Sequence, residues 1–345
     1  MQREKSKQIR QFILEQIRRH PKNLVSLIEK RFNLTRQAVH RHLQKMIEEG
    51  LIIAEGSTRL RQYHLKPIIE KEKFIVISKD LKEDVLWRQE VLPVLGGIPK
   101  NVLDICHYGF TEMFNNVLDH SMAKHATISL CYTVVDIKIE IFDDGVGIFK
   151  KIQKELGLED LRHAILELSK GKLTTDPKHH TGEGIFFSSR MFDNFSILSG
   201  ALYFLHNERG DWLIGEIEEK QGTLVGMEID ISSPRTVKEV CDKFSSDSED
   251  YGFTKTIVPV SLARYGDENL VSRSQAKRLL ARFEKFKEII LDFEGVEIIG
   301  QAFADEIFRV FYQKNPNIHI TFFRANEQVE KTIHRAIRGR SESNQ

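Results

Sequence analysis

The chain has 345 residues, which is too long for one compact hydrophobic core and favours two or three domains. A composition of 41% hydrophobic and 29% charged residues is typical of a globular protein. We find no long apolar run and no signal-peptide pattern, and therefore expect a cytoplasmic protein with no membrane partner. Three widely separated cysteines argue against a disulfide framework and against a structural zinc site.

The net charge of +1 conceals two oppositely charged regions. Residues 1–66 carry 15 Lys and Arg against 6 Asp and Glu, whereas the remainder carries 36 against 44. The basic first region predicts contact with a polyanion, although a solvated basic surface would have the same composition.

The first 66 residues show the pattern of three helices followed by a β-hairpin. Apolar periodicity and turn residues predict these elements in chain order: helices over residues 5–20, 24–28 and 36–49, and strands over 51–54 and 61–65. Thr35 is placed to cap the third helix, and Gly50 to end it. This order resembles the winged helix-turn-helix domains of bacterial DNA-binding regulators.

In winged-helix domains the third helix enters the major groove with its N-terminal residues against the base edges. The resemblance implies double-stranded DNA as the partner of residues 1–66, with contacts at these positions: Arg36, Gln37, His40 and Arg41 on the third helix, and Arg59 and Arg61 in the hairpin. Arginine suits the electrostatic attraction that dominates such binding. A winged helix that mediates protein contacts or dimerisation is the alternative.

A predicted helix from Val102 to His120 carries the first of four polar motifs. On it Glu112, Asn116 and His120 follow one another at a spacing of four, so they share one helical face. A carboxylate and an amide on one face are weak evidence for a site, because such pairs are common on the solvent-exposed face of a helix.

Three further motifs follow. A predicted strand over residues 137–142 ends in Asp143-Asp144-Gly145-Val146-Gly147, an acid with two glycines that permit close backbone approach to a ligand. Next, Gly182-Glu183-Gly184 opens a predicted helix, whose free N–H groups suit phosphate oxygens. The last motif is a predicted strand that carries Thr223.

Together the four motifs resemble the GHKL superfamily of gyrase-type topoisomerases, heat-shock-90-type chaperones, histidine kinases and mismatch-repair ATPases. The resemblance implies a two-layer α/β sandwich, the Bergerat ATP-binding fold, with ATP and Mg²⁺ as cofactors and a mobile lid. By position it implies these roles: Glu112 activates the attacking water, Asn116 binds Mg²⁺, Asp119 lies near the nucleotide, Asp143 accepts from the adenine amino group, Gly145 and Gly147 lie beside the base, Gly182 and Gly184 lie near the phosphates, and Thr223 lies near adenine.

These roles agree with the chemistry of the side chains. An amide oxygen is a hard ligand that suits Mg²⁺, and a carboxylate one turn away can orient a water for in-line attack. A purely structural Glu112, with ATP bound but hardly hydrolysed, is the alternative. We therefore expect ATP binding together with a slow ATPase activity.

Two features depart from the sensor kinases of this superfamily. No helical pair with a phospho-accepting histidine precedes residue 80, so autophosphorylation of that kind is not expected. The lid segment, residues 150–180, is long and ends in His179-His180. We interpret these histidines as lid surface and not as a metal site, because no acid or cysteine lies at ligand spacing.

Beyond residue 252, strands alternate with helices, which predicts a small α/β domain. Its centre reads Leu291-Asp292-Phe293-Glu294-Gly295-Val296, then Ile299-Gly300-Gln301-Ala302-Phe303, and resembles STAS-like domains of the DUF4325 type. In STAS antagonists of anti-sigma factors, a serine or threonine near the start of the equivalent helix accepts phosphate. Gly300-Gln301 offers no hydroxyl there, so docking of a protein partner or dimerisation is implied instead.

The patterns predict a multidomain α/β protein with these boundaries: a winged helix over residues 1–66, a linker over 67–83, a GHKL domain over 84–232, a linker over 233–252 and a STAS-like domain over 253–340. We expect a DNA-binding transcriptional regulator switched by ATP binding or hydrolysis. A serine/threonine kinase resembling anti-sigma kinases, and a scaffold with structural ATP, are the alternatives. A homodimer is expected by analogy with winged-helix regulators.

Overall fold

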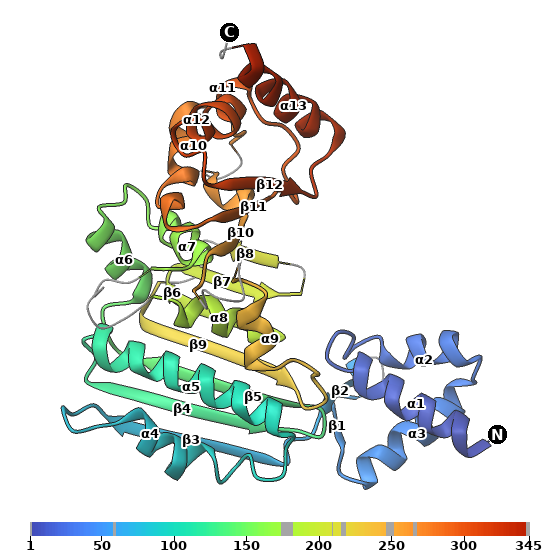
Figure 1. Ribbon diagram of the computed structural model, residues 1–345. Coiled ribbons are helices and arrows are strands. Elements are labelled where there is room, and N and C mark those ends of the chain that lie inside the picture. The colour runs from blue at the N-terminus through green and yellow to red at the C-terminus, as the bar shows by residue number, and fades with distance from the viewer. Residues whose placement is uncertain are drawn as a thin grey trace.

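The protein is a mixed α/β, multidomain molecule (Figure 1). A computed structural model describes residues 2–57, 60–173, 182–208, 210–214, 219–245, 252–264 and 268–342. Buried apolar side chains form two separate cores. One core lies within residues 9–65, and the other extends from Ile75 to Ala336.

The N-terminal unit consists of three helices and a two-stranded hairpin, as expected from the apolar pattern. Its elements are α1 Gln2–Gln16, α2 Leu24–Phe32, α3 Arg36–Glu48, β1 Ile52–Glu55 and β2 Gln62–Leu65. The Thr35 hydroxyl accepts a hydrogen bond from the Ala38 N–H at 3.3 Å and so caps α3, because the first N–H groups of a helix lack partners within it. Val39, Leu43 and Met46 form the buried face of this helix.

A seven-stranded antiparallel sheet forms the centre of the molecule. Its strands, in spatial order, are β3 Ile69–Val76, β4 His125–Tyr132, β5 Asp136–Asp143, β9 Lys220–Asp230, β6 Asn194–Gly200, β7 Leu202–Asn207 and β8 Gly210–Ile214. Alternation places Ile137, Ile139 and Ile141 of β5 in the core.

The edge strand β3 lies in the segment that we expected to be a linker. Its sequence alternates acidic and basic residues from Glu70 to Lys73, so it lacks the apolar pattern that reveals a half-buried strand. It nevertheless pairs with β4 along its whole length and buries Ile75. Charged side chains are common on edge strands, where they oppose pairing with other chains.

Helices cover one face of this sheet, and the long helix α5 crosses β4 and β5 (Figure 1). The elements of this layer are α4 Glu83–Leu86 with a π-helical turn Trp87–Val91, α5 Lys100–His120, α6 Ile148–Leu156, α7 Arg162–Lys170, α8 Gly184–Met191 and α9 Val237–Asp242. Phe110 and Phe114 of α5 are fully buried. Their packing orients the helix, so that its opposite face is turned away from the core.

The second expected linker, residues 233–252, also contains ordered structure. Thr236 begins α9 with a capping box to Glu239, and Val240 and Phe244 are buried in the large core. The polar residues around α9 concealed this short amphipathic turn in the sequence, because a helix of six residues shows too little periodicity.

The C-terminal unit has a three-stranded parallel sheet flanked by helices. Its strands, in spatial order, are β10 Lys255–Pro259, β11 Glu288–Asp292 and β12 His319–Phe323. Its helical segments are Val260–Ala263, α10 Arg273–Leu280, Phe283–Lys285, α11 Gln301–Asp305, a π-helical segment Glu306–Phe311, α12 Tyr312–Lys314 and α13 Glu327–Glu342. Helix α10 ends at Leu280, because Ala281 leaves the helical conformation and Arg282 is left-handed.

Among the helices of the described residues, none is both long and apolar enough to cross a lipid bilayer.

Candidate functional site

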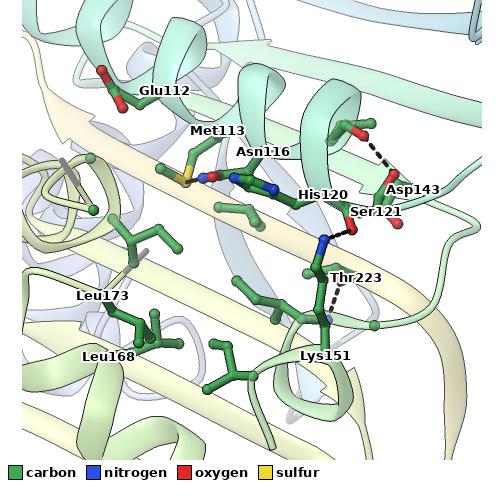
Figure 2. A pocket seen from close by; sticks show the side chains of 18 of the residues that line it. Glu112, Met113, Asn116, His120, Ser121, Asp143, Lys151, Leu168, Leu173 and Thr223 are labelled. Atoms are coloured by element: carbon green, nitrogen blue, oxygen red, sulfur yellow. Dashed lines mark hydrogen bonds between the residues drawn. The ribbon is translucent and has the colours of Figure 1, made fainter. Parts of the chain in front are cut away.

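A pocket of about 290 Å³ lies between α5, the start of α6, the end of α7 and the start of α8 (Figure 2). The ends of β5 and β9 also line it, and Asp143 and Thr223 lie opposite each other in the register of these strands. The polar and glycine residues that line it are Glu112, Asn116, His120, Ser121, Asp143, Gly147, Lys151, Gly182, Glu183, Gly184 and Thr223. All four predicted motifs therefore meet at one pocket.

One face of α5 forms a long wall of this pocket. Glu112, Asn116 and His120 all line it, as their spacing predicted, and Figure 2 shows them in sequence along the helix. The Nδ2 atom of Asn116 lies 4.0 Å from the Met113 sulfur. Asp119, which we expected near the nucleotide, is exposed and lines a different hollow with Ser78 and Leu118.

Asp143 occupies the end of the pocket opposite Glu112 (Figure 2). It is the last residue of β5 and only 4% exposed, and one oxygen accepts a hydrogen bond from the Gly145 N–H at 2.9 Å. Burial raises the pKa of the Asp143 carboxyl to about 6, with a smaller contribution from Asp144, while the Gly145 N–H opposes the rise. This carboxyl therefore changes charge near neutral pH.

Thr223 stands beside Asp143 with its hydroxyl already engaged. Its Oγ1 atom accepts a hydrogen bond from the Ile148 N–H at 3.1 Å, which ties β9 to the first residue of α6. A hydroxyl keeps both a proton to donate and a second lone pair, so Thr223 retains hydrogen-bonding capacity toward the pocket.

Packing requires the glycines of the second motif. A Cβ atom on Gly145 would lie 2.2 Å from the Ser121 carbonyl oxygen, and one on Gly147 would lie 2.8 Å from the Ser199 hydroxyl. Gly147 also has φ +83°, which side chains rarely adopt. Gly222 escaped notice in the sequence, although a Cβ there would lie 1.9 Å from the Asp143 carbonyl oxygen.

Gly184 is the first residue of α8 and lies against Glu112. A Cβ on Gly184 would approach Oε2 of Glu112 to 2.0 Å, so the carboxylate contacts the helix N-terminus directly. The partial positive charge of a helix N-terminus favours a carboxylate there. Gly182, with φ +72°, accepts a hydrogen bond from the Leu173 N–H at 3.0 Å, which brings Leu173 close to the start of α8. His179 and His180 lie outside the described residues.

Lys151 and Glu183 line the pocket and were missed in the sequence. The Nζ atom of Lys151 donates to the His120 carbonyl oxygen at 2.9 Å, and Figure 2 shows the side chain facing α5. Neighbouring Lys150 instead forms an exposed ion pair with Glu219. In the sequence the two lysines differ only in the face of the helix that each would occupy. That face could not be predicted, because it depends on the residue at which α6 begins.

The described part of the site contains no cluster of anionic side chains that could coordinate a metal by themselves. Among the residues that the structure describes, no three His, Cys, Asp or Glu side chains converge in a way that would hold an ion. Asn116 nevertheless offers an amide oxygen beside the Glu112 carboxylate, and Mg²⁺ needs few protein ligands, because it keeps waters and substrate phosphates.

The predicted DNA-contact residues gather on the N-terminal unit. Arg36, Gln37, Arg41 and Arg61 are exposed, whereas His40 is half-buried with Nδ1 3.4 Å from the Tyr63 hydroxyl. Arg59 lies outside the described residues. This face of α3 is opposite to Val39 and Leu43, so the helix presents its basic side to solvent.

Comparison with known proteins identifies one part of the chain. Residues 275–330 match the family described as a STAS-like domain of unknown function (DUF4325). The C-terminal unit therefore contains a STAS-like domain. The match covers the segment from α10 through β11 and β12 into α13. No curated protein matches the chain.

Proposed function

We propose that the pocket binds ATP with Mg²⁺ in a domain of the Bergerat type that contains the whole seven-stranded sheet, including β3. The observation that carries this proposal is the arrangement of Asp143 and the Glu112–Asn116 pair at opposite ends of one pocket. A buried carboxylate suits the amino group of a purine, and an amide with a carboxylate suits a metal-bound phosphate. The helices on one face of an antiparallel sheet support the same fold.

Asn116 would hold Mg²⁺ through its side-chain oxygen, because it is the neutral oxygen donor on the pocket face of α5. Bound Mg²⁺ would neutralise the charge of the phosphates. Lys151 would add a positive charge between the two ends of the pocket. This charge would favour an anionic ligand in a pocket that is also lined by the acidic side chains Glu112, Glu183 and Asp143.

Glu112 would orient a water for attack on the terminal phosphate, with Gly184 keeping the carboxylate close to the start of α8. This step would make the protein a slow ATPase. Asp119 takes no part in this scheme, because it lies in the hollow beside Ser78.

The N-terminal unit would act as a winged helix that binds double-stranded DNA. Exposed Arg36 and Arg41 near the start of α3, and the excess of basic residues before residue 67, support this role. Together these parts make the protein an ATP-responsive transcriptional regulator.

Isothermal titration calorimetry of the full chain tests the nucleotide site. We expect ATP to bind in the presence of Mg²⁺ and much more weakly after Mg²⁺ is chelated. Asn116→Ala should lose the Mg²⁺ dependence, whereas Asn115→Ala, on the adjacent position outside the pocket, should keep it. Absence of Mg²⁺-dependent heat with the unaltered protein would overturn the proposal.

A further inference from the structure

Helix α7 belongs both to the pocket and to the contact with the STAS-like unit. Leu168 lines the pocket, and Leu173 does so just beyond the helix. On the same helix, His163 through Lys170 are all buried, although several of these residues are polar or charged. Such extensive burial of a polar helix requires a partner for each polar group.

Two buried charged side chains of α7, Glu167 and Lys170, contact the STAS-like unit. Lys170 is fully buried, and its Nζ atom lies 2.6 Å from Oε1 of Glu167. The other oxygen of Glu167 lies 2.7 Å from Nη1 of Arg282. One carboxylate on α7 thus joins a lysine of its own helix to an arginine just beyond α10.

Backbone carbonyls complete this network. Nζ of Lys170 donates to the Ala281 carbonyl oxygen at 2.9 Å and to that of Arg278 at 3.3 Å, so it caps the end of α10. In the other direction, Arg282 donates to the Gly171 carbonyl oxygen at 3.0 Å. The buried Thr256 hydroxyl donates to the Lys170 carbonyl oxygen at 2.7 Å. Groups from both sides are satisfied only in this relative position.

Aromatic packing extends the contact to α8. Nζ of Lys172 donates to the Lys285 carbonyl oxygen at 2.9 Å and lies 5.7 Å from the centre of the Phe253 ring. The Phe253 ring in turn lies 4.4 Å from that of Phe186, which lines the pocket. Buried side chains therefore run without interruption from the pocket wall to the STAS-like unit.

Arg282 adopts a left-handed conformation with φ +65° to make these contacts. A non-glycine residue pays a conformational cost there, and it persists when the surroundings determine the position. Buried ion pairs also contribute little net stability compared with apolar packing, but they penalise any displacement that leaves a charge unpaired. The network therefore fixes geometry more strongly than it adds stability.

We propose that the STAS-like unit holds α7 in place and thereby couples its own position to ligand binding in the pocket. The identity of the ligand rests on the proposed function, whereas the grip on α7 does not. A ligand-driven shift of α7 must carry α10 and Arg282 with it. A partner that repositions the STAS-like unit would change nucleotide affinity, and by reciprocity the nucleotide would change affinity for that partner.

Substitutions that weaken the contact between α7 and the STAS-like unit provide the test. Arg282→Met removes one of the two cationic partners of Glu167 and leaves Lys170, and Lys172→Met, at the edge of the contact, is the milder variant. Lys331→Met is the matched control, because Lys331 forms a solvent-exposed ion pair with Glu327 on α13 of the same unit. Each full-length variant is examined by hydrogen–deuterium exchange, first without any ligand and then with MgATP.

Without ligand, we expect both test variants to increase exchange in α7 and at the start of α8, while β4 and the control remain unchanged. With nucleotide, we expect affinity for MgATP to fall about tenfold in Arg282→Met and less in Lys172→Met. MgATP should also protect α10 in the unaltered protein. Unchanged exchange at α7 in both variants would overturn the proposed hold on this helix.

Unchanged MgATP affinity, together with increased exchange, would overturn the coupling. An unaltered protein that binds no MgATP would refute the proposed function. The ligand-free exchange would still decide whether the STAS-like unit holds α7.

Discussion

Asp143 is the residue whose protonation most directly affects the proposed binding of the adenine base. Its raised pKa means that the folded protein retains a proton that an unfolded aspartate, with a pKa of 3.8, would lose. This group therefore contributes stability below about pH 4, and that contribution is lost as the pH rises from about 4 to about 6. Asp143→Asn should remove this part of the pH dependence in thermal unfolding.

Nucleotide binding should show the opposite pH dependence. An amino group donates a stronger hydrogen bond to an ionised carboxylate than to a neutral acid, so ATP should bind more tightly at pH 7.5 than at pH 5. The apparent midpoint should lie near 6, and binding near that pH should release a proton. Calorimetry in buffers of different ionisation enthalpy measures this release. A flat profile from pH 5 to 7.5 would exclude Asp143 as the acceptor.

Two adjacent lysines give a matched pair that tests whether the charge of Lys151 contributes to ATP binding. Lys151 lines the pocket, whereas Lys150 pairs with Glu219 on the surface. Lys151→Ala should weaken ATP binding by roughly 1–2 kcal/mol, as expected for loss of a charged hydrogen bond, and should hardly affect adenosine. Lys150→Ala should change neither affinity. An equal loss for ATP and adenosine would show that Lys151 acts on the shape of the pocket and not on phosphate.

At the scale of elements, the sequence was most informative where periodicity and polar motifs agreed. The face of α5 could be predicted, because Glu112, Asn116 and His120 recur every four residues beside an apolar stripe. The charged edge strand β3 could not, because its exposed residues hide the alternation. The position of Asp119 was also missed, since it depends on the loop at Ser78 and not on the helix alone.

Contacts distant in the sequence were equally hidden. Nothing in the spacing of Glu167 and Arg282 indicates that they meet, because their contact depends on the left-handed turn after α10. The order of strands was inaccessible for the same reason: β9 lies between β5 and β6, which requires pairing across more than eighty residues of chain.

The junction of α5 and α8 yields a prediction about both elements. Gly184→Ala would place a methyl group within 2.0 Å of the Glu112 carboxylate, so one of the two must move. We expect destabilisation by roughly 1–3 kcal/mol and loss of any ATPase activity. Gly157→Ala serves as a control for glycine loss with free space around it, although its φ of +61° also carries a conformational cost. ATP hydrolysis that survives Gly184→Ala would argue against a role for Glu112 as positioned here.

At the scale of the molecule, a basic unit with its own core is attached to an acidic body. The two meet through polar contacts, including Arg18 with Glu228 at 2.5 Å and Arg19 with Glu208 at 3.2 Å. The separate core of residues 9–65 allows this unit to act as a module, while the pocket and the STAS-like unit share one core.

DNA binding should therefore reside in the basic unit and respond strongly to salt. We expect affinity for double-stranded DNA to fall linearly on a plot of log K against log salt concentration. Arg36→Ala or Arg41→Ala should weaken binding, because the start of α3 is expected against the base edges. Fluorescence anisotropy at several salt concentrations measures both effects. Unchanged DNA affinity in both variants would favour protein binding as the role of α3.

The most direct measurement of the central claim is a crystal structure of the full chain with Mg²⁺ and a non-hydrolysable ATP analogue. We predict that the adenine amino group lies within hydrogen-bonding distance of Asp143, and that Mg²⁺ is bound by the Asn116 side-chain oxygen and the phosphates. An analogue bound elsewhere, or bound in the pocket with its base at Glu112 and its phosphates at Asp143, would contradict this claim.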